Sequence, residues 1–411
     1  MKNSSRPPPA SPLHSPTAKS VARERQSRSS SEKEMNPTPA GPSDSLTRQK
    51  NLEEAEEAAV ARYPRALLSR ALRGVSPEIL EVVIMIQAYI FAAFYIVYEL
   101  FFDLYRRPGS MSSIVHEICA SSYIQKHTSE SILTPPQAVV SGADGTIGTQ
   151  IVLLLLRLGF RVCALCGPSS QLREVSSTWP TQERARLRIF VINLEDSLRT
   201  RQYLSKLGER VGTVDALFLG SAIMLGDVKT KICDIPRHLW LNVLTQAAIY
   251  RHLSAHLSPN ARVAALSSVC AYSAELPSRE QSALLTDVAG GHEAYARSKL
   301  LLSIFIEQAA KQSSGDDSAR LVSLHPGVIA SGLYRNANFL VRTVNDSIGK
   351  KLYRSPELAA ALCIHTAVRD DIKPGHFYRD LEPTMIRPEI SNSRRRKIYN
   401  EMQRLIDEHL M

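Results

Sequence analysis

Residues 137–157 read QAVVS-GADGTIG-TQIVLLLLR. The stretch 137–141, with its three central apolar residues, is typical of a short strand, and the apolar residues within 149–157 predict a helix. Glycines lie between the two, where they let the backbone approach a phosphate closely while the helix N-terminus favours its negative charge. The stretch therefore predicts a dinucleotide-binding turn, and we expect cofactor contacts from Ser141, Gly142, Asp144, Gly145, Thr146, Ile147 and Gly148.

The same alternation of strand and helix continues along the chain. Further apolar runs predict strands at 160–166, 187–192, 214–219, 261–266 and 320–324. Strands separated by helices predict an α/β fold, here a Rossmann-like doubly wound parallel sheet of six or seven strands within residues 135–385. Ligands bind such sheets at the carboxyl ends of the strands, which is where Gly142, Gly220, Ser268 and Pro326-Gly327 fall.

A tyrosine and a lysine four residues apart are the first candidates for chemistry. Tyr295 and Lys299 lie in a helical pattern, so they share one helix face. An ammonium beside a phenol favours the phenolate and lowers the pKa of the phenol. Such pairs also arise by chance, so this one gains its weight from the motifs around it.

Taken together, these motifs resemble the short-chain dehydrogenase/reductase superfamily over roughly residues 135–383. The late segments 355–357 and 375–378 and the turn at 325–327 are most similar to its membrane-associated, retinol-dehydrogenase-like branch, whose substrates are usually retinoids, steroids or other lipid carbonyls. The residues that carry the resemblance are the glycine turn 141–148, Asn242, Ser267-Ser268, Tyr295, Lys299, Pro326-Gly327 and Ser331.

The resemblance implies a role for each matching position. Tyr295 would be the general acid/base, Lys299 would lower its pKa and hold the nicotinamide ribose, and Ser268 would bond the substrate oxygen. Asn242 would support a proton-relay water. Further cofactor contacts would come from Asn193, Gly220, Ser221, Pro326, Gly327 and Ser331, beside Tyr295 and Lys299. No metal site is implied.

Three departures from the family pattern keep an alternative open. The glycine turn has the Gly-x-x-Gly-x-x-Gly spacing of the extended branch, with Thr146 where the conventional branch has glycine. The motif after the fourth strand is altered to residues 219–222, LGSA, and Asn193 replaces an adenine-contacting Asp. We favour an NAD(P)-dependent oxidoreductase acting on an apolar substrate, with a membrane-tethered dinucleotide-binding protein of little or no activity as the alternative.

The choice between NAD and NADP is open from sequence. The second strand ends in residues 165–169, LCGPS, without a carboxylate for a ribose 2′-hydroxyl. This absence slightly favours NADP, with Arg173 as a candidate partner of its 2′-phosphate.

The chain before the α/β domain has a different character. Residues 1–50 are rich in Ser, Pro and basic residues and are expected to be disordered. A helical basic linker is expected at 51–79, a membrane-spanning or membrane-embedded helix at 80–107 and a linker at 108–134. Val82–Tyr98 contains no charged residue over seventeen positions, the lower limit for crossing a bilayer. A surface-lying helix and an apolar docking helix are the competing interpretations.

These features predict a single-pass membrane protein, with the endoplasmic reticulum as the favoured location. Four arginines before the apolar segment and two after it weakly place the N-terminal tail in the cytosol. Asn345-Asp346-Ser347 is a glycan acceptor that would be used only in the lumen. Orientation is therefore open.

The remaining features concern partners and the C-terminus. The net charge of +10 is spread along the chain without a basic stripe, so no nucleic acid partner is expected. The expected partners are a lipid bilayer and an apolar small molecule, covered by the mixed apolar and basic segment 333–341, with a homodimer left open.

Cys163 and Cys166 are expected in the core. Residues 386–411 are expected to form a solvated basic turn, including Arg394–Lys397, and a last helix.

Overall fold

The computed structural model describes residues 74–103, 111–129, 135–278, 281–313, 315, 317–336, 343, 347 and 352–411. All of them belong to one compact unit, Glu56–Met411. The expected N-terminal tail, the arginines at 62–73 and 106–107, and Asn345 lie outside the described residues, as does most of the expected covering segment 333–341.

A sheet of eight strands forms the centre of this unit. Its spatial order is β10-β9-β8-β7-β4-β1-β2-β3, in which every neighbouring pair is parallel except β9 and β10. The strands are β1 (Gln137–Ser141), β2 (Arg161–Cys166), β3 (Leu187–Val191), β4 (Val214–Leu219), β7 (Leu257–Leu266), β8 (Arg320–His325), β9 (Phe377–Arg379) and β10 (Glu382–Thr384). The doubly wound sheet expected from the sequence is confirmed.

The order of strands reverses between β1 and β4. The chain winds outward from β1 through β2 to β3, then returns to the other side of β1 at β4 and continues to β7 and β8. Such a switch point leaves a crevice at the carboxyl ends of the two central strands. A separate two-stranded ladder, β5 (Lys231–Ile232) with β6 (Ile235–Pro236), lies outside this sheet.

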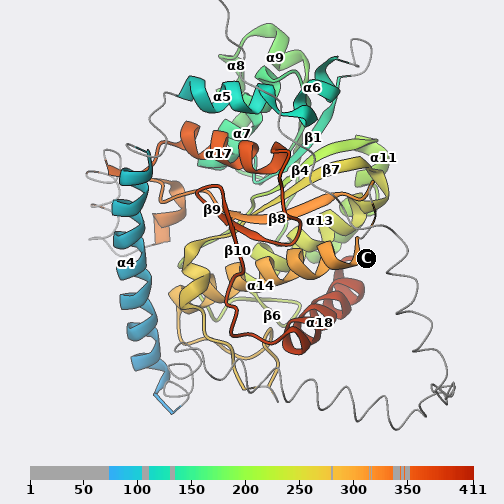
Figure 1. Cartoon of the computed structure of the whole chain (residues 1–411). Coiled ribbons are helices and arrows are strands. Elements are labelled where there is room, and N and C mark those ends of the chain that lie inside the picture. Colours follow the sequence, from blue (N-terminus) through green and yellow to red (C-terminus); the bar gives the residue numbers. More distant parts are fainter. Residues whose placement is uncertain are drawn as a thin grey trace, which may run out of the picture. The chain divides into compact units, whose positions relative to one another are not determined.

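Helices cover both faces of the sheet (Figure 1). One face carries α5 (Met111–Ala120), α7 (Thr146–Arg157) and α17 (Pro356–Val368), and the other carries α13 (Thr245–Leu253), α14 (Gly291–Gln312) and α18 (Asn392–Leu410). The shorter helices are α6 (Ser122–Ser129), α8 (Leu172–Ser177), α9 (Thr181–Ala185), α10 (Ser197–Leu204), α11 (Leu207–Val211), α12 (Arg237–Leu239), η2 (Trp240–Leu244), η3 (Ser254–His256), η4 (Val269–Ser273) and η5 (Gly332–Asn336).

Two segments differ from the sequence expectation. The expected linker 108–134 contains α5 and α6, because Ile114 and Ile118 lie four residues apart and are buried on one face of α5. The basic run that begins α18 is not simply solvated. Arg395 is 1% exposed, since its guanidinium binds the Glu307 carboxylate at 2.6 Å and the carbonyl oxygen of Ile390 at 3.0 Å.

The apolar segment forms α4 (Pro77–Phe101), which begins with Pro77 after the exposed Ser76. A proline is well tolerated in this first turn because its missing N–H has no partner within the helix. In Figure 1, α4 stands beside the domain along its whole length, and it contacts α14 and η4. It is the one helix among the described residues that is long and apolar enough to cross a membrane.

Candidate active site

The glycine turn between β1 and α7 brings two strand ends into close contact. Gly142 has φ +66°, and a Cβ there would lie 2.8 Å from the Ser221 nitrogen after β4. A Cβ on Gly148 would collide with the carbonyl oxygen of Gly142. Only glycine allows α7 to start this close to β1, so the sequence pattern and the packing agree.

The first turn of α7 is free of a side-chain cap. Gly145 occupies the N-cap and has no side chain to offer, so the N–H groups of residues 146–148 face out of the helix end. Together with the close backbone approach at Gly142, this arrangement fits a pyrophosphate, because the N–H groups and the helix dipole both favour negative charge. The residues present therefore fit the dinucleotide that the glycine turn predicts.

Ser141 and Asp144 hold this turn in place. The Ser141 hydroxyl donates to Gln246 and accepts from the N–H of Gly220 at 3.0 Å, which ties the ends of β1 and β4 together. Asp144 is exposed, and its carboxylate accepts from the N–H of Gly167 at 3.0 Å, directly after β2. A carboxylate thus stands at the end of β2, supplied by the glycine turn rather than by the strand itself.

Asn242 lies in η2, a π-helical turn that precedes α13. Its side chain is fully buried and holds the loop after β4, accepting from the N–H of Ile223 at 2.8 Å and donating to its carbonyl oxygen at 3.0 Å. The same amide donates to the Ser298 hydroxyl at 2.9 Å. Asn242 therefore joins this loop to α14, and π-turns of this kind occur frequently at functional sites.

Ser268 and Tyr295 come from different elements and meet at the edge of the sheet. Ser268 follows β7 and caps η4, where its hydroxyl accepts from the N–H of Cys270 at 3.2 Å. Tyr295 lies in the first turns of α14 and is 6% exposed. The Ser268 side chain lowers the pKa of the Tyr295 phenol, so the two side chains are neighbours.

Lys299 lies one turn after Tyr295 on α14, as the spacing predicts. Its Nζ is 5.6 Å from the centre of the Tyr295 ring and donates to the carbonyl oxygen of Leu266 at 2.8 Å. Burial lowers the pKa of Lys299 from 10.5 to about 8. This ammonium can therefore lose its proton near neutral pH.

The pKa of Tyr295 differs in direction from the sequence expectation. Burial raises the pKa of the phenol well above its ordinary value, the thiol of Cys270 and the phenol of Tyr334 raise it further, and the bond from Ser268 only partly offsets them. The reason lies in the geometry, because the Lys299 ammonium is directed to the Leu266 carbonyl and lies over the ring face. Desolvation outweighs a charge placed in this way.

Cys270 is a neighbour that sequence reasoning missed. It is two residues after Ser268, and its thiol is close enough to raise the pKa of Tyr295. Burial raises the pKa of the thiol itself, while Ser268 and Lys299 lower it, so the thiol stays protonated. No motif in the sequence distinguishes Cys270 from a core cysteine, and only the fold places it beside the phenol.

The turn after β8 is held by residues that the sequence did not single out. Gly327 has φ +110°, and a Cβ there would lie 2.8 Å from the Arg354 guanidinium and 3.2 Å from the Glu99 carboxylate. Arg354 donates to the carbonyl oxygen of Pro326 at 3.3 Å, and Glu99 accepts from the N–H of Val328 at 3.0 Å. A residue of α4 thus supports the expected cofactor turn Pro326-Gly327.

The outer predicted residues make local contacts. Asn193, after β3, is exposed, and its side chain accepts from the N–H of Glu195 at 3.1 Å. The hydroxyl of Ser331 accepts from the N–H of Leu333 at 3.3 Å, just before η5. Both side chains stabilise turns of their own chain segments.

The sequence model of the family described as short chain dehydrogenase matches residues 136–276, which include the glycine turn, Asn242 and Ser268. Over this stretch the chain is similar to the short-chain dehydrogenase/reductase superfamily. Its match to a polyprenol dehydrogenase of Homo sapiens is 25% identical and covers 58% of this chain and 75% of that protein. The match to the Mus musculus polyprenol dehydrogenase is also 25% identical and covers 60% and 77%.

Solved structures agree on the fold. A protein from Mycobacterium paratuberculosis superposes with a TM-score of 0.50 and 18% identity, over 67% of this chain and 95% of that chain. The match to the short-chain dehydrogenase family and to the two polyprenol dehydrogenases supports an oxidoreductase.

Proposed function

We propose that this protein is an NAD(P)-dependent oxidoreductase that interconverts an alcohol and a carbonyl on an apolar, lipid-like substrate. The observation that carries the proposal is the convergence of Ser268, Tyr295 and Lys299 beside a glycine turn that fits a dinucleotide. Ser268 follows β7, Tyr295 and Lys299 lie in α14, and the glycine turn connects β1 to α7. Only the fold brings these segments together.

The roles of the side chains follow from their positions. The bound nicotinamide would accept or give the hydride at the substrate carbon. Tyr295 would exchange the proton at the substrate oxygen, and Ser268 would hold that oxygen by a hydrogen bond. The buried Lys299 would stabilise the phenolate form of Tyr295, and a positioned acid/base of this kind contributes typically about 10²–10⁴-fold to the rate.

The other residues of the proposed cofactor site would be those that the sequence predicts at the carboxyl ends of the strands. Ser141 and Asn242 would shape it through their bonds to neighbouring backbone, and Cys270 is an added neighbour of the phenol. Contacts with the dinucleotide itself would come from Gly142, Asp144, Gly145, Thr146, Ile147, Gly148, Asn193, Gly220, Ser221, Tyr295, Lys299, Pro326, Gly327 and Ser331.

An apolar substrate is supported by the surroundings of Tyr295. Val269, Val328 and Tyr95 form a buried apolar cluster beside the site, and Tyr334 approaches the phenol. The two relatives are named polyprenol dehydrogenases. An apolar site around one proton-exchanging phenol suits a lipid that carries a single alcohol or carbonyl group.

We further propose that NAD is preferred over NADP. The sequence shows no carboxylate after β2, which favoured NADP, but the Asp144 carboxylate lies at the N–H of Gly167. A carboxylate here suits a ribose 2′-hydroxyl and repels a 2′-phosphate. Calorimetric titration tests this, because Asp144→Asn keeps an acceptor for Gly167 while removing the charge. The affinity for NADP should rise relative to that for NAD, and an unchanged ratio would contradict the proposal.

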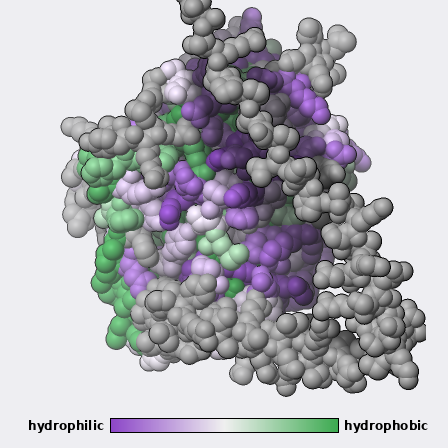
Figure 2. All heavy atoms as spheres, viewed as in Figure 1, coloured by the Kyte–Doolittle hydropathy of each residue, from purple (hydrophilic) through white to green (hydrophobic). Residues whose placement is uncertain are grey.

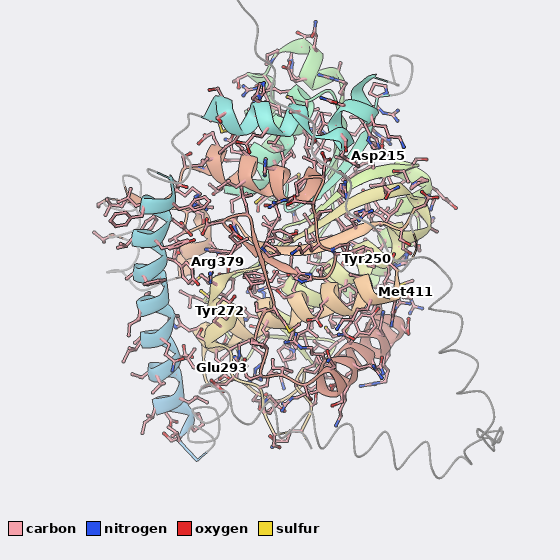
Figure 3. The ribbon with its side chains drawn as sticks, viewed as in Figure 1. Asp215, Tyr250, Tyr272, Glu293, Arg379 and Met411 are labelled. Carbon is pink, nitrogen blue, oxygen red and sulfur yellow. The ribbon has the colours of Figure 1, made fainter. Side chains whose placement is uncertain are left out.

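The decisive test of the reaction is Tyr295→Phe, which keeps the ring and deletes the proton. Turnover of a polyprenol or another lipid alcohol should fall at least about 100-fold, while cofactor binding remains. Tyr250→Phe is the matched control, because Tyr250 (labelled in Figure 3) lies in α13 against Phe305, which is ten residues after Tyr295 on α14. Equal activity of wild type and Tyr295→Phe would refute the assignment.

The rival function is a membrane-tethered dinucleotide-binding protein without turnover. It is favoured by one observation, the direction of the Lys299 ammonium to the Leu266 carbonyl rather than to the phenol. It predicts heat released on cofactor titration and no product with any lipid alcohol. A membrane location, with the endoplasmic reticulum as the favoured compartment, accompanies both proposals and is supported by α4 and by an apolar substrate.

A further inference from the structure

The distribution of polar and apolar side chains on α4 is the reverse of that on a surface helix of a water-soluble domain. Such a helix turns its apolar side toward the core. The side of α4 that faces the domain carries its polar groups. Near its N-terminus, Glu81 accepts from His292 at 2.9 Å, and Tyr89 lies 3.3 Å from the other ring nitrogen of the same histidine. In the middle, Arg379 donates to the Tyr95 hydroxyl at 2.5 Å.

The C-terminal part of α4 is bound in the same way. Glu99 is 3% exposed, lies 3.2 Å from Nε2 of His325 and accepts from the N–H of Val328. Asp103, just beyond the helix, accepts from the Arg354 guanidinium at 3.0 Å. Figure 3 shows Arg379, on the side of the domain next to α4. Polar contacts therefore hold α4 to the domain from its first turn to its last.

The opposite side of α4 is apolar. Figure 2 shows it as a continuous green band. From Ile79 onward, every exposed residue that the structure describes on this helix is apolar. The large ones follow at three- and four-residue intervals from Ile79 to Leu100, and Phe101 adjoins the last of them. They form one stripe, the outer stripe: Ile79, Val82, Ile86, Ile90, Phe94, Val97, Leu100 and Phe101, with exposures between 44% and 62%.

We propose that α4 lies in the plane of the membrane, with the outer stripe in the hydrocarbon of one leaflet and the opposite side on the catalytic domain. A helix of 25 residues is about 37 Å long. Since it is docked along that whole length, a spanning α4 would carry the domain into the bilayer with it. For an isolated interfacial helix, water and headgroups solvate the polar side; here the domain takes that place.

The charges at the two ends favour lipid over a second copy of the chain. Four arginines stand at 62–73, before α4, and Arg106-Arg107 follow it. Anionic headgroups attract basic residues near a membrane surface. Two outer stripes packed against each other would bring arginines together in either orientation, because both ends are basic.

This placement puts the reacting edge of the sheet next to the leaflet. His292 on α14 is three residues before Tyr295, and η4 directly follows Ser268, so two of the elements that contact α4 lie at the site. The site is then about one helix diameter, roughly 10 Å, from the hydrocarbon. The inference concerns membrane docking alone and holds whether or not the proposed reaction is correct.

Cysteine labelling of the full-length protein in sealed microsomes distinguishes the two topologies. Ser76→Cys and Ser113→Cys place one exposed thiol at each end of the apolar region, in a background where the exposed Cys119 and Cys233 are serine. If α4 lies in the plane of the membrane, both thiols are on the same side of it. A membrane-impermeant maleimide added before detergent then labels both positions or neither. Labelling of one position with protection of the other would overturn the proposal.

Vesicle binding by purified full-length protein tests the outer stripe itself. Combined Ile86→Ser, Ile90→Ser and Phe94→Ser should weaken binding to phosphatidylcholine–phosphatidylserine vesicles at least about 100-fold, since three large side chains leave hydrocarbon. The matched control replaces exposed apolar residues elsewhere, Val191, Leu198 and Met385, by serine and should keep binding.

Thermal unfolding of both triple variants is the control that checks whether they remain folded. Undiminished vesicle binding by the α4 variant would overturn the proposal. So would a wild-type protein that ignores vesicles and forms a dimer that the α4 variant splits, because the outer stripe would then cover a second copy.

Discussion

Glu99→Leu gives opposite results for a spanning and a docked α4. In a spanning helix, replacing an acidic residue by leucine favours insertion by about 3 kcal/mol. In the structure, Glu99 is buried against the domain and accepts from the N–H of Val328 at 3.0 Å, with His325 at 3.2 Å. Leucine would leave the Val328 N–H without its acceptor. We therefore expect a loss of stability.

The size of this loss follows from the contacts. Removing one partner of a buried charged pair costs about 3–5 kcal/mol, because the other partner stays buried without compensation. The estimate applies here since Glu99 is 3% exposed and Arg354 is fixed beside it at Gly327. The remaining acids Asp103 and Asp380 still bind Arg354, at 3.0 and 2.8 Å, which keeps the loss near the lower end of that range.

Urea unfolding in mild detergent measures the effect through the fluorescence of the buried Trp240. The midpoint should fall for Glu99→Leu, and proteolysis should release α4 earlier. Glu78→Leu is the matched control, since Glu78 is exposed in the first turn of α4 and should change stability by less than about 0.5 kcal/mol. A Glu99→Leu protein as stable as the wild type would refute the docked arrangement.

The remaining predictions concern the site and its supports. Burial lowers the pKa of Lys299 from 10.5 to about 8, so the unfolded protein binds more protons than the folded one between these pH values. The stability of the wild type relative to Lys299→Met should therefore rise by about 3 kcal/mol from pH 8 to 10.5. Urea midpoints without such a rise would contradict the buried ammonium. Gly148→Ala forces a Cβ onto the Gly142 carbonyl and should destabilise by about 1–3 kcal/mol and weaken dinucleotide binding, measured by calorimetry. The pKa of His127 is raised by Asp215, and the pKa of Asp215 is lowered below 3.8 despite burial, chiefly by His127. The stability lost in Asp215→Asn should therefore be largest between about pH 4 and 6.5, shrinking as His127 deprotonates above that range, and a pH-independent loss in thermal scans would contradict the pairing.

Much of the sheet could be predicted because its signals are local. Residues 137–141 and 214–219 are short, mostly apolar stretches, and the structure has β1 and β4 at these positions. The glycine turn is equally local, since Gly142 has a positive φ angle and a Cβ on Gly148 would collide with the carbonyl oxygen of Gly142, six residues before it. The three-residue strands β9 and β10 were missed, because they are too short to show a period.

Contacts between distant segments could not be predicted. Glu81 and His292 are 211 residues apart, and Glu99 and Val328 are 229 apart. In the sequence, Glu99 next to a long apolar run suggests a carboxylate reaching toward water. Only the fold shows that its partners are protein groups. The raised pKa of Tyr295 has the same origin, because burial by segments far away in sequence outweighs the lysine one turn away.

The composition of α4 satisfies two demands that conflict in water. Its contacts with His292, Arg379 and Val328 require polar groups on the side that faces the domain. The outer stripe, on the opposite side, presents more apolar surface than a water-exposed helix of a stable monomer should. A bilayer leaflet removes the conflict, since it covers the apolar side without competing for the polar contacts. A lipid-like substrate would then be dissolved in the same leaflet that the helix occupies. A single arrangement, with α4 between the domain and one membrane leaflet, thus explains why Glu99 is buried in an apolar helix. The same arrangement explains why the surroundings of Tyr295 are apolar and why the proposed substrate is a lipid.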